Sequence, residues 1–312
     1  MRIASLLPSA TEIVCALGLA DCLVGVSHEC DYPAAVVADL PKLTRSAIPQ
    51  GLSSAAIDAA VSTRLRNGES LYLLDGATIQ ALQPDLLITQ ELCDVCAVSY
   101  DDVCNLARWL PGAPQVVSLT PPDLLGIFAD VQTIAAATGV AERGEALIAN
   151  LQARLEVVKT AVEGQPRPRV FALEWLDPPF AAGHWVPEMV ALAGGEEVLG
   201  RAGEKSFRVT WEQVVAAQPE VILLMPCGYS QEAAQQEWAA LPKPAGWERL
   251  PAVQKGRVYA LDANSYCSRP APRVVDGIEQ LAQLFHPAVQ VTEVARPGNE
   301  WGLLPPKAPV GR

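Results

Sequence analysis

Two stretches of this sequence repeat each other: ALQPDLLI at residues 81–88 and AAQPEVIL at residues 216–223. Each has the pattern of a helix end, a proline that stops the helix, an acidic residue and a buried strand. A second pair of similar stretches precedes them, RIASL at 2–6 and RVFAL at 169–173. The repeat predicts two similar α/β lobes, about 1–119 and 168–290.

Hydrophobic spacing predicts alternating strands and helices in both lobes, which favours parallel sheets. The expected elements of the first lobe are strands 2–6, 23–26, 86–89 and 115–119 and helices 9–18, 54–66, 76–82 and 100–110. Those of the second lobe are strands 169–174, 221–225 and 258–262 and helices 186–193, 211–217, 231–239 and 272–285. Capping boxes are expected at 9–12 and 210–213, where Ser or Thr is followed three residues later by Glu or Gln.

The segment between the lobes keeps helical spacing of its apolar residues from Asp123 to Glu163, with Gly139 as a point of bending. We therefore expect one long backbone helix within residues 120–167, acting as a stiff strut. Residues 291–312 carry four prolines and are expected to form a tail on the surface. The predicted fold class is α/β, with two Rossmann-like lobes joined by this helix.

The composition excludes several classes of function. The chain has 312 residues, enough for about two domains. Its 23 basic and 35 acidic residues give a net charge of −12 without a basic run, which argues against nucleic-acid binding. No apolar stretch reaches the roughly 18 residues that a membrane-spanning helix needs.

The N-terminus does not resemble a secretion signal, because Pro8 and Glu12 interrupt the apolar residues that follow Arg2. This predicts a cytoplasmic protein, with a periplasmic or cell-surface location as the alternative. Disulfides are rare in the cytosol, so the 8 cysteines are expected to be thiols or ligands.

The loops after the predicted strands define a candidate site, because ligands of α/β sheets bind beyond the carboxyl ends of the strands. A cleft between two such lobes, with flat side chains and few charges, suits a large, planar, largely apolar ligand. The candidate ligand-binding residues are Pro8, Ser9, His28, Glu29, Tyr32, Trp175, His184, Trp185, Tyr229, Tyr266 and Arg269.

Three of these residues have two interpretations each. His28 is either an axial ligand of a metal such as cobalt or a hydrogen-bonding loop residue. Trp185 either stacks on the edge of a macrocycle or belongs to the core. Arg269 either holds a carboxylate, amide or phosphate of the ligand or forms a salt bridge inside its lobe.

The cysteines offer a candidate metal or iron–sulfur site. Cys93 and Cys96 form a CxxC pair, whose two thiolates can hold a soft metal. A full site needs about four ligands, and Cys30 and Cys267 follow other predicted strands. Buried reduced thiols and a redox pair are the alternatives.

The chain resembles the cobalamin and ferric-siderophore class of ABC-transporter substrate-binding proteins, and most closely its BtuF-like vitamin B12-binding members. The residues that carry this resemblance are 5–12, 24–27, 31–33, 84–88 and 269–273. The resemblance covers about 1–287 and implies a class III substrate-binding protein with a helical backbone. It also implies cobalamin as bound ligand, without chemistry on it, and docking on an ABC permease through one acid on each lobe. Glu212 matches the acid of the second lobe, whereas residues 53–56 of the first lobe carry none.

No motif predicts catalysis: the sequence has no P-loop, no GxGxxG, no GxSxG and no HExxH. The predicted function is therefore a non-catalytic receptor for cobalamin or a related corrinoid or metal chelate. Two alternatives are a metal or iron–sulfur protein that uses the cysteines of the cleft, and a thiol enzyme that uses Cys30.

Overall fold

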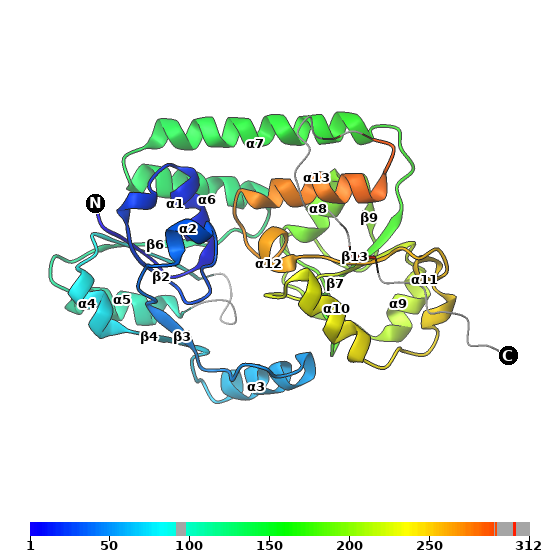
Figure 1. Ribbon diagram of the computed structural model, residues 1–312, viewed down its shortest axis with the longest axis horizontal. Helices are drawn as coiled ribbons and strands as arrows, with labels where there is room; N and C mark the ends of the chain where they lie inside the picture. The colour runs from blue at the N-terminus through cyan, green and yellow to red at the C-terminus, as the bar shows by residue number, and fades with distance from the viewer. Residues whose placement is uncertain (92–97, 290, 292–301, 304–312) are drawn as a thin grey trace. The chain divides into compact units, whose positions relative to one another are not determined.

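The structure, a computed structural model, describes residues 1–91, 98–289, 291 and 302–303 (Figure 1). The chain forms two compact units, each with its own sheet. The first unit comprises Met1–Leu52, Ala56–Leu151 and Pro270–Pro272. The second comprises Ser53–Ala55, Gln152–Arg269 and Arg273–Arg312. The α/β fold class expected from the sequence is confirmed.

The first unit is built on a parallel sheet with the strand order β2-β1-β5-β6. Its strands are β1 (Ile3–Ser5), β2 (Leu23–Val26), β5 (Leu86–Gln90) and β6 (Gln115–Leu119). Helices α1 (Pro8–Ala16) and α6 (Leu124–Ala137) pack on one face of the sheet, and α4 (Gly76–Leu82) and α5 (Tyr100–Trp109) on the other. Because both faces are covered, β5 is buried along its whole length, which explains its unbroken apolar run.

Smaller elements complete the first part of the chain. A separate antiparallel pair, β3 (Thr44–Ser46) and β4 (Tyr72–Leu74), was not expected from the sequence. The helices are η1 (Ala20–Cys22), α2 (Ala34–Val37) and α3 (Ser54–Arg66). The missed strands have three residues each, too few to show an alternating pattern.

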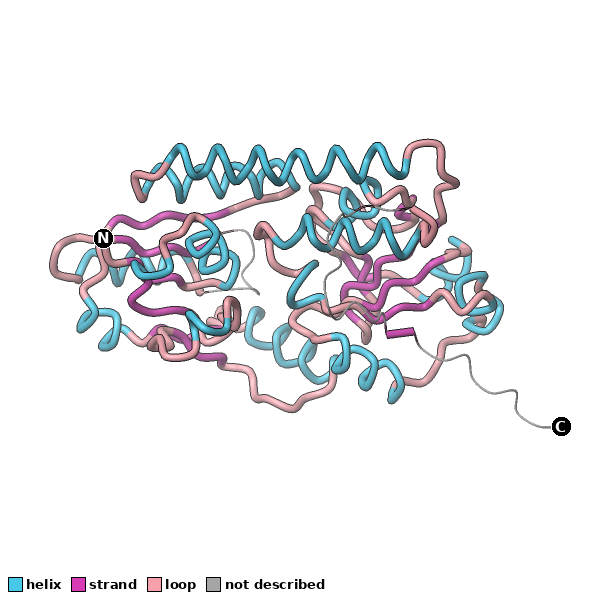
Figure 2. The backbone as a smooth tube through the Cα atoms, turned by 45° about the horizontal axis from the view of Figure 1, so that its top comes forward, coloured by secondary structure: helices cyan, strands magenta, loops and turns pink. Residues whose placement is uncertain are grey.

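The sheet of the second unit has a parallel centre and antiparallel edges, and its strands run side by side in Figure 2. Its order is β10 (Phe207–Arg208), β8 (Phe180–Ala181), β7 (Arg169–Trp175), β11 (Val221–Leu224), β12 (Val258–Ala260) and β13 (Gly302–Leu303), and β9 (Glu196–Glu197) also pairs with β7. Its helices are α8 (Val186–Leu192), α9 (Trp211–Ala217), α10 (Gln231–Ala240), η2 (Trp247–Arg249), α11 (Pro251–Gln254), α12 (Ala263–Tyr266) and α13 (Arg273–Phe285). One core lies between the sheet and α9, α10, η2 and α11.

The sequence repeat is also a repeat of hydrogen bonds. Arg2 donates its backbone amide to Asp85 Oδ2 at 2.7 Å, and Arg169 donates its backbone amide to Glu220 Oε2 at 3.2 Å. The Nε of each arginine donates to a carbonyl in the last turn of the helix before the proline, at 2.8 and 3.3 Å. The two units therefore tie their first strand to the next helix–strand connection in the same way.

The segment expected to form one long helix is divided into α6 and α7 (Ala141–Val162). The division lies at Gly139, whose φ of +73° is in the left-handed region that glycine adopts most easily. The amide of Val140 donates to Ala135 O at 2.8 Å, which closes the end of α6 as in a Schellman motif. Helix α7 alone provides the long helix, and its residues divide between the units after Leu151.

The capping box expected at residues 9–12 is wrong. Helix α1 begins at Pro8 with Leu7 as its N-cap and no side-chain cap, so Ser9 and Glu12 lie inside the helix and are buried. Proline fits the first helical position because its missing N–H has no partner there in any case. The box at 210–213 is confirmed in α9, with both of its hydrogen bonds present.

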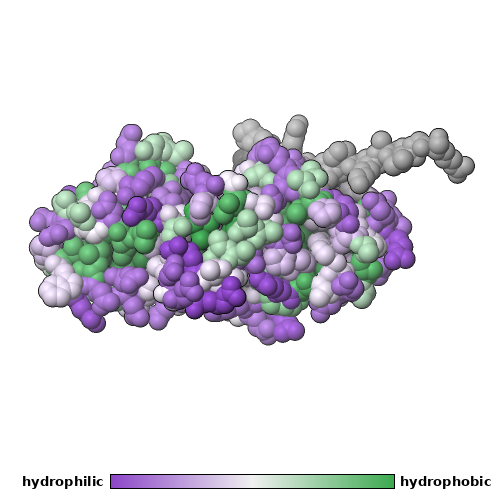
Figure 3. All heavy atoms as spheres, turned by 90° about the horizontal axis from the view of Figure 1, so that it is seen from below, coloured by the Kyte–Doolittle hydropathy of each residue, from purple (hydrophilic) through white to green (hydrophobic). Residues whose placement is uncertain are grey.

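The surface and the tail add two observations. Apolar residues lie in small groups between polar ones on the face shown in Figure 3, as is usual for a surface in water. Within the described part of the chain, no helix has the length and apolar character to span a membrane. Of the tail, only residues 291, 302 and 303 are described, and β13 adds an antiparallel edge next to β12.

Candidate functional site

His28 follows β2 at the carboxyl edge of the first sheet, where the sequence placed a metal ligand or a loop residue. Its Nδ1 lies 2.7 Å from Thr44 Oγ1, which also receives the His28 backbone amide at 3.1 Å and contacts Ser27 Oγ at 2.9 Å. With the proton on Nδ1, Thr44 accepts from His28 and donates to Ser27, and Nε2 keeps its lone pair. Burial, and then the positive charge of Lys42, lower the pKa of His28. The imidazole is therefore neutral at pH 7 and suited to donate to a metal centre.

Tyr72 contacts two of the candidates in the first unit, Glu29 and His28. The Tyr72 hydroxyl donates to Glu29 Oε1 at 3.1 Å, and its ring centroid lies 5.7 Å from that of His28. Glu29 is exposed, and Tyr32 is 44% exposed. These side chains are open to contact a ligand.

Pro8 and Ser9 lie in the first turn of α1, beyond the carboxyl end of β1. The Ser9 hydroxyl is buried and makes no hydrogen bond with any residue that the structure describes. A buried hydroxyl without a partner costs free energy, so a polar group that reached Ser9 would recover part of that cost.

Trp175 and Tyr229 meet at the carboxyl edge of the second sheet. Trp175 is the last residue of β7, and Tyr229 lies in the loop after β11. Their rings pack edge to face, with centroids 5.8 Å apart and an interplanar angle of 87°. Burial, and then the negative charge of Glu237, raise the pKa of Tyr229, which stays a neutral phenol at physiological pH. The pair offers a fixed, uncharged aromatic surface.

His184 and Trp185 are adjacent in sequence but differ in environment. Trp185 is 6% exposed and donates its indole N–H to Cys267 O at 2.8 Å, so the structure places it in the core. His184 has a φ of +50°, and its Nε2 is buried without a hydrogen-bond partner among the described residues. Burial, and then the charge of Lys205, lower the pKa of His184, which is therefore a second neutral imidazole.

Arg269 is also buried, at 7% exposure, and donates to Asn264 Oδ1 at 2.9 Å. Tyr266 belongs to α12, and the Arg273 guanidinium carbon lies 5.8 Å from its ring centroid. The loop that carries Arg269 is therefore held from within the chain, and Arg269 contributes to that support.

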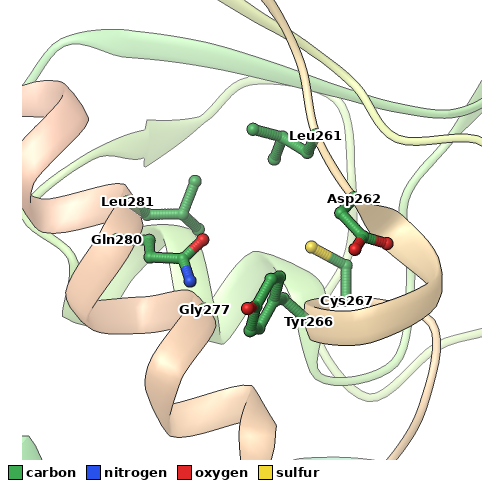
Figure 4. A pocket seen from close by; sticks show the side chains of 7 residues that line it. All are labelled: Leu261, Asp262, Tyr266, Cys267, Gly277, Gln280 and Leu281. Carbon is green, nitrogen blue, oxygen red and sulfur yellow. The ribbon is translucent and has the colours of Figure 1, made fainter. Parts of the chain in front are cut away.

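The four cysteines of the candidate metal site divide into two groups. Cys93 and Cys96 lie outside the described residues. Cys30 is 4% exposed, with its Sγ 3.1 Å from Thr11 Oγ1. Cys267 is 3% exposed and lines a cavity of about 10 Å³ together with Asp262 and Tyr266 (Figure 4).

The chemistry of the Cys267 thiol does not favour metal binding. Burial, and then the charges of Asp262 and Glu174, raise the pKa of Cys267 to about 12, which keeps it a protonated thiol. Among the residues that the structure describes, no three His, Cys, Asp or Glu side chains are grouped so that they could hold a metal ion. The four-cysteine site stays a prediction.

Glu212, the candidate docking residue, is exposed in the first turn of α9. Its own backbone amide, and then the Thr210 hydroxyl, lower the pKa of its carboxyl group. Glu212 therefore presents a fixed negative charge at the surface.

Two residues that shape the first unit's part of the site were not predicted. Thr44 holds His28, and Tyr72 holds Glu29. Both belong to the β3–β4 pair, whose strands are joined by a long connection that includes α3. Their only sequence signal is a β-branched and an aromatic residue in short apolar stretches, which is too weak to identify a strand pair.

Comparison with known proteins identifies the family. The family described as periplasmic binding protein matches residues 3–265, most of the chain. This chain belongs to the periplasmic binding protein family. The family resemblance recognised in the sequence is thereby confirmed.

Members of the periplasmic binding protein family resemble this chain over nearly its full length. The vitamin B12-binding protein of Vibrio cholerae is 27% identical over 283 residues, which are 90% of this chain and 87% of that protein. The crystal structure of periplasmic vitamin B12-binding protein BtuF of the same species has 25% identity and a TM-score of 0.61, and covers 91% of this chain and 96% of its own. The periplasmic heme-binding protein RhuT from Roseiflexus sp. RS-1 has 25% identity and a TM-score of 0.67, and covers 93% and 99%.

The expected cytoplasmic location is wrong. The family is described as periplasmic, and both related structures are of periplasmic proteins. The expectation rested on Pro8 and Glu12, which interrupt the apolar residues after Arg2; both lie in α1, directly after the strand β1 that begins at Ile3. A first strand of this kind is a requirement of the fold in any compartment, so it carries no information about location.

Proposed function

We propose that this protein binds a corrinoid or a related metal chelate, with cobalamin as the first candidate. The observation that carries the proposal is the 27% identity to a vitamin B12-binding protein along 90% of the chain. The family consists of binding proteins, so no catalysis is assigned to the site.

The side chains at the carboxyl edges of the sheets support this ligand class. The first unit offers neutral His28 and exposed Tyr32, and the second offers the edge-to-face pair of Trp175 and Tyr229. A macrocycle with a metal centre needs flat apolar contacts and one neutral nitrogen donor. We assign aromatic contact to Tyr32, Trp175 and Tyr229, and axial donation to His28.

Heme is a second candidate, favoured by the likeness to heme-binding protein RhuT. A neutral imidazole serves the iron of heme as well as the cobalt of a corrinoid. The two ligands differ in shape, since a corrinoid carries amide side chains around the ring whereas heme carries two carboxylates.

Titration of the purified protein separates the two candidates. Hydroxocobalamin, cyanocobalamin and hemin are each added while tryptophan fluorescence and visible absorption are recorded. We expect saturable binding of the cobalamins and a visible band shift only with hydroxocobalamin, whose bound water is exchangeable for imidazole. Saturation by hemin alone would assign the site to heme, and absence of saturation by all three ligands would refute the proposal.

His28→Ala tests the axial role. The variant should keep binding cyanocobalamin through its aromatic contacts but lose the band shift with hydroxocobalamin. The matched control is His184→Ala, a second neutral imidazole, which should keep the shift. A band shift that persists in His28→Ala but disappears in His184→Ala would move the axial role to His184.

We further propose that the protein delivers its ligand to an ABC permease and that Glu212 contacts this partner. Glu212→Gln should leave ligand affinity unchanged but weaken stimulation of ATP hydrolysis by the cognate transporter in vesicles. Glu232→Gln is the matched control, because Glu232 is also an exposed acid in the first turn of a helix of the second unit. An equal loss in both variants would show that overall charge, not Glu212, matters.

A further inference from the structure

The second unit has a groove at the edge of its sheet opposite to the proposed ligand-binding loops. The groove has a volume of about 350 Å³ and is lined by residues that directly precede the parallel strands, including Pro168 before β7, Glu220 before β11 and Arg257 before β12. The end of α13 closes it with Phe285 and His286. Because parallel strands all begin at one edge, this site is separate from the loops at their carboxyl ends.

Arg257 provides a positive charge in this groove. It is half-buried, and within the described part of the chain its guanidinium has no hydrogen-bond or ion-pair partner. Its backbone amide and carbonyl, in contrast, are both bonded, so the chain holds its Cα in place. An arginine shielded from water usually has an anionic or carbonyl partner.

Arg167 provides a second guanidinium, fixed by the backbone. One of its terminal nitrogens donates to Ala191 O at 3.1 Å and to Gly195 O at 2.6 Å. These bonds occupy one nitrogen and leave donors on the others for a ligand. The Arg167 guanidinium group is therefore oriented before any ligand binds.

His286 and Glu220 complete the charged surroundings. His286 is 7% exposed, and burial lowers its pKa; a hydrogen bond with the Gly194 backbone opposes this shift, and the charges of Arg257 and Arg167 add to it. Both guanidinium groups therefore act on the imidazole. Glu220, the one acid among the described residues of the lining, accepts from the Arg169 amide at 3.2 Å and from Lys255 Nζ at 3.5 Å. The Arg169 bond, and then the charges of Lys255 and Arg257, lower the pKa of its carboxyl group, so Glu220 already carries a negative charge that faces more than one cation.

We propose that this groove is a binding site for a small oxyanion, held by Arg257 and Arg167. Phosphate and carboxylate both match the planar, two-pronged donors of arginine. The chain as a whole has a net charge of −12, but this groove has two arginines and one acid that is already paired. The electrostatic potential is therefore more positive here and attracts anions. The site serves a ligand different from the proposed chelate, so it stands independently of the proposed function.

NMR of the His286 ring tests the site, because the histidine reports on the charge beside it. Inorganic phosphate and, separately, succinate are titrated into the full chain at constant ionic strength, with chloride as the reference. We expect a saturable shift of the His286 signal and a higher apparent pKa of His286 with the bound anion, since its charge offsets the two arginines. A response to phosphate alone would define a phosphate site, and a response to both would define a general oxyanion site.

Arg257→Gln is the decisive variant. Because the described residues give its side chain no partner, the variant should fold normally, which its melting temperature without phosphate will show. We expect the saturable response to fall at least about tenfold in affinity, the effect of losing one charge-assisted bond. Arg201→Gln is the control, since Arg201 is an exposed arginine of the same unit paired with Glu204 and outside the groove. No saturable response in the unaltered protein, or an equal response in Arg257→Gln, would overturn the proposal.

Discussion

Asp130 is a carboxyl group that the fold buries with only part of its hydrogen-bonding capacity in use. It lies in α6 and is 7% exposed, and within the described part of the chain its Oδ2 makes no hydrogen bond. Burial raises the pKa of Asp130 to about 7, and a hydrogen bond from the Thr120 amide opposes this only in part. Because the folded state holds the proton more tightly than the unfolded state, the contribution of Asp130 to the free energy of unfolding is greatest below pH 4. This contribution is lost as the pH rises toward 7.

Asp130→Asn should therefore stabilise the protein at pH 8, by about 1–3 kcal/mol, the cost of a poorly satisfied buried charge. At pH 4.5 the carboxyl is protonated, and the variant should differ little from the unaltered chain. Urea unfolding at both pH values measures the difference. Asp21→Asn at an exposed position is the control, and a gain of equal size at both pH values would contradict the titration argument.

At the scale of an element, the ends of α4 and α9 carry a matched pair of strained residues. Gln83 and Gln218 are the C-caps of these helices, with φ of 45° and 46°. Non-glycine residues pay about 1 kcal/mol for this left-handed conformation. At Gln218 a hydrogen bond offsets part of this free-energy cost, because its side-chain Nε2 donates to Val215 O at 2.7 Å.

Gln83→Gly should raise the free energy of unfolding by about 0.5–1 kcal/mol, and Gln218→Gly should raise it less. Thermal or urea unfolding measures both gains. Gln80→Gly inside α4 is the matched control and should destabilise by about 1 kcal/mol, since that exposed position is helical. A larger gain at Gln218 than at Gln83 would refute the role of the side-chain bond.

Helix α7 is fixed to α13 by one arginine. Arg154 donates to both carboxylate oxygens of Glu279, at 2.8 and 2.7 Å, and also to Asp276. Glu279 is 6% exposed, so loss of the arginine would take two charge-assisted hydrogen bonds from a buried carboxylate. Bidentate geometry further distinguishes this contact from an ordinary surface pair.

Arg154→Met should lower the free energy of unfolding by about 2–4 kcal/mol, somewhat less than for a fully buried pair because Arg154 is 26% exposed. Lys159→Met is the control on the same helix. Its ion pair with Glu156 is 66% and 69% exposed and should be worth less than about 1 kcal/mol. Urea unfolding measures both variants. If Arg154→Met and Lys159→Met lowered the free energy of unfolding equally, the charge pair of Arg154 would not be what anchors the helix.

The elements that could be predicted from the sequence are those whose signal is local. The helices at 54–66, 76–82 and 211–217 have the predicted bounds, because turn residues or a proline mark their ends. The β3–β4 pair and the Thr44–His28 contact were not predictable, because they join residues far apart along the chain. Ser9 shows a third case, in which a capping-box pattern in the sequence is no cap in the structure, because the preceding proline takes the first helical position and Ser9 lies inside the helix.

At the scale of the whole molecule, the tryptophans divide unequally between the two units. The chain has seven, of which Trp301 lies outside the described residues. Trp109 belongs to the first unit and is 85% exposed. Five belong to the second unit: Trp175, Trp185, Trp211, Trp238 and Trp247. Among them, Trp238 and Trp247 are 3% and 5% exposed, with ring centroids 4.8 Å apart. Tryptophan fluorescence therefore reports on the second unit, whereas circular dichroism reports on both.

Each unit has its own sheet and core, so we expect the two to unfold in separate steps. Urea transitions followed by fluorescence and by far-ultraviolet circular dichroism should then not coincide. Arg154→Met changes the second unit and should move the fluorescence transition to lower urea concentration. Asp130→Asn changes the first unit. At pH 8 it should move only the transition of that unit, which circular dichroism records and fluorescence does not. Coincident transitions that both variants move together would instead show that α7, whose residues divide between the two units, couples them into one cooperative structure.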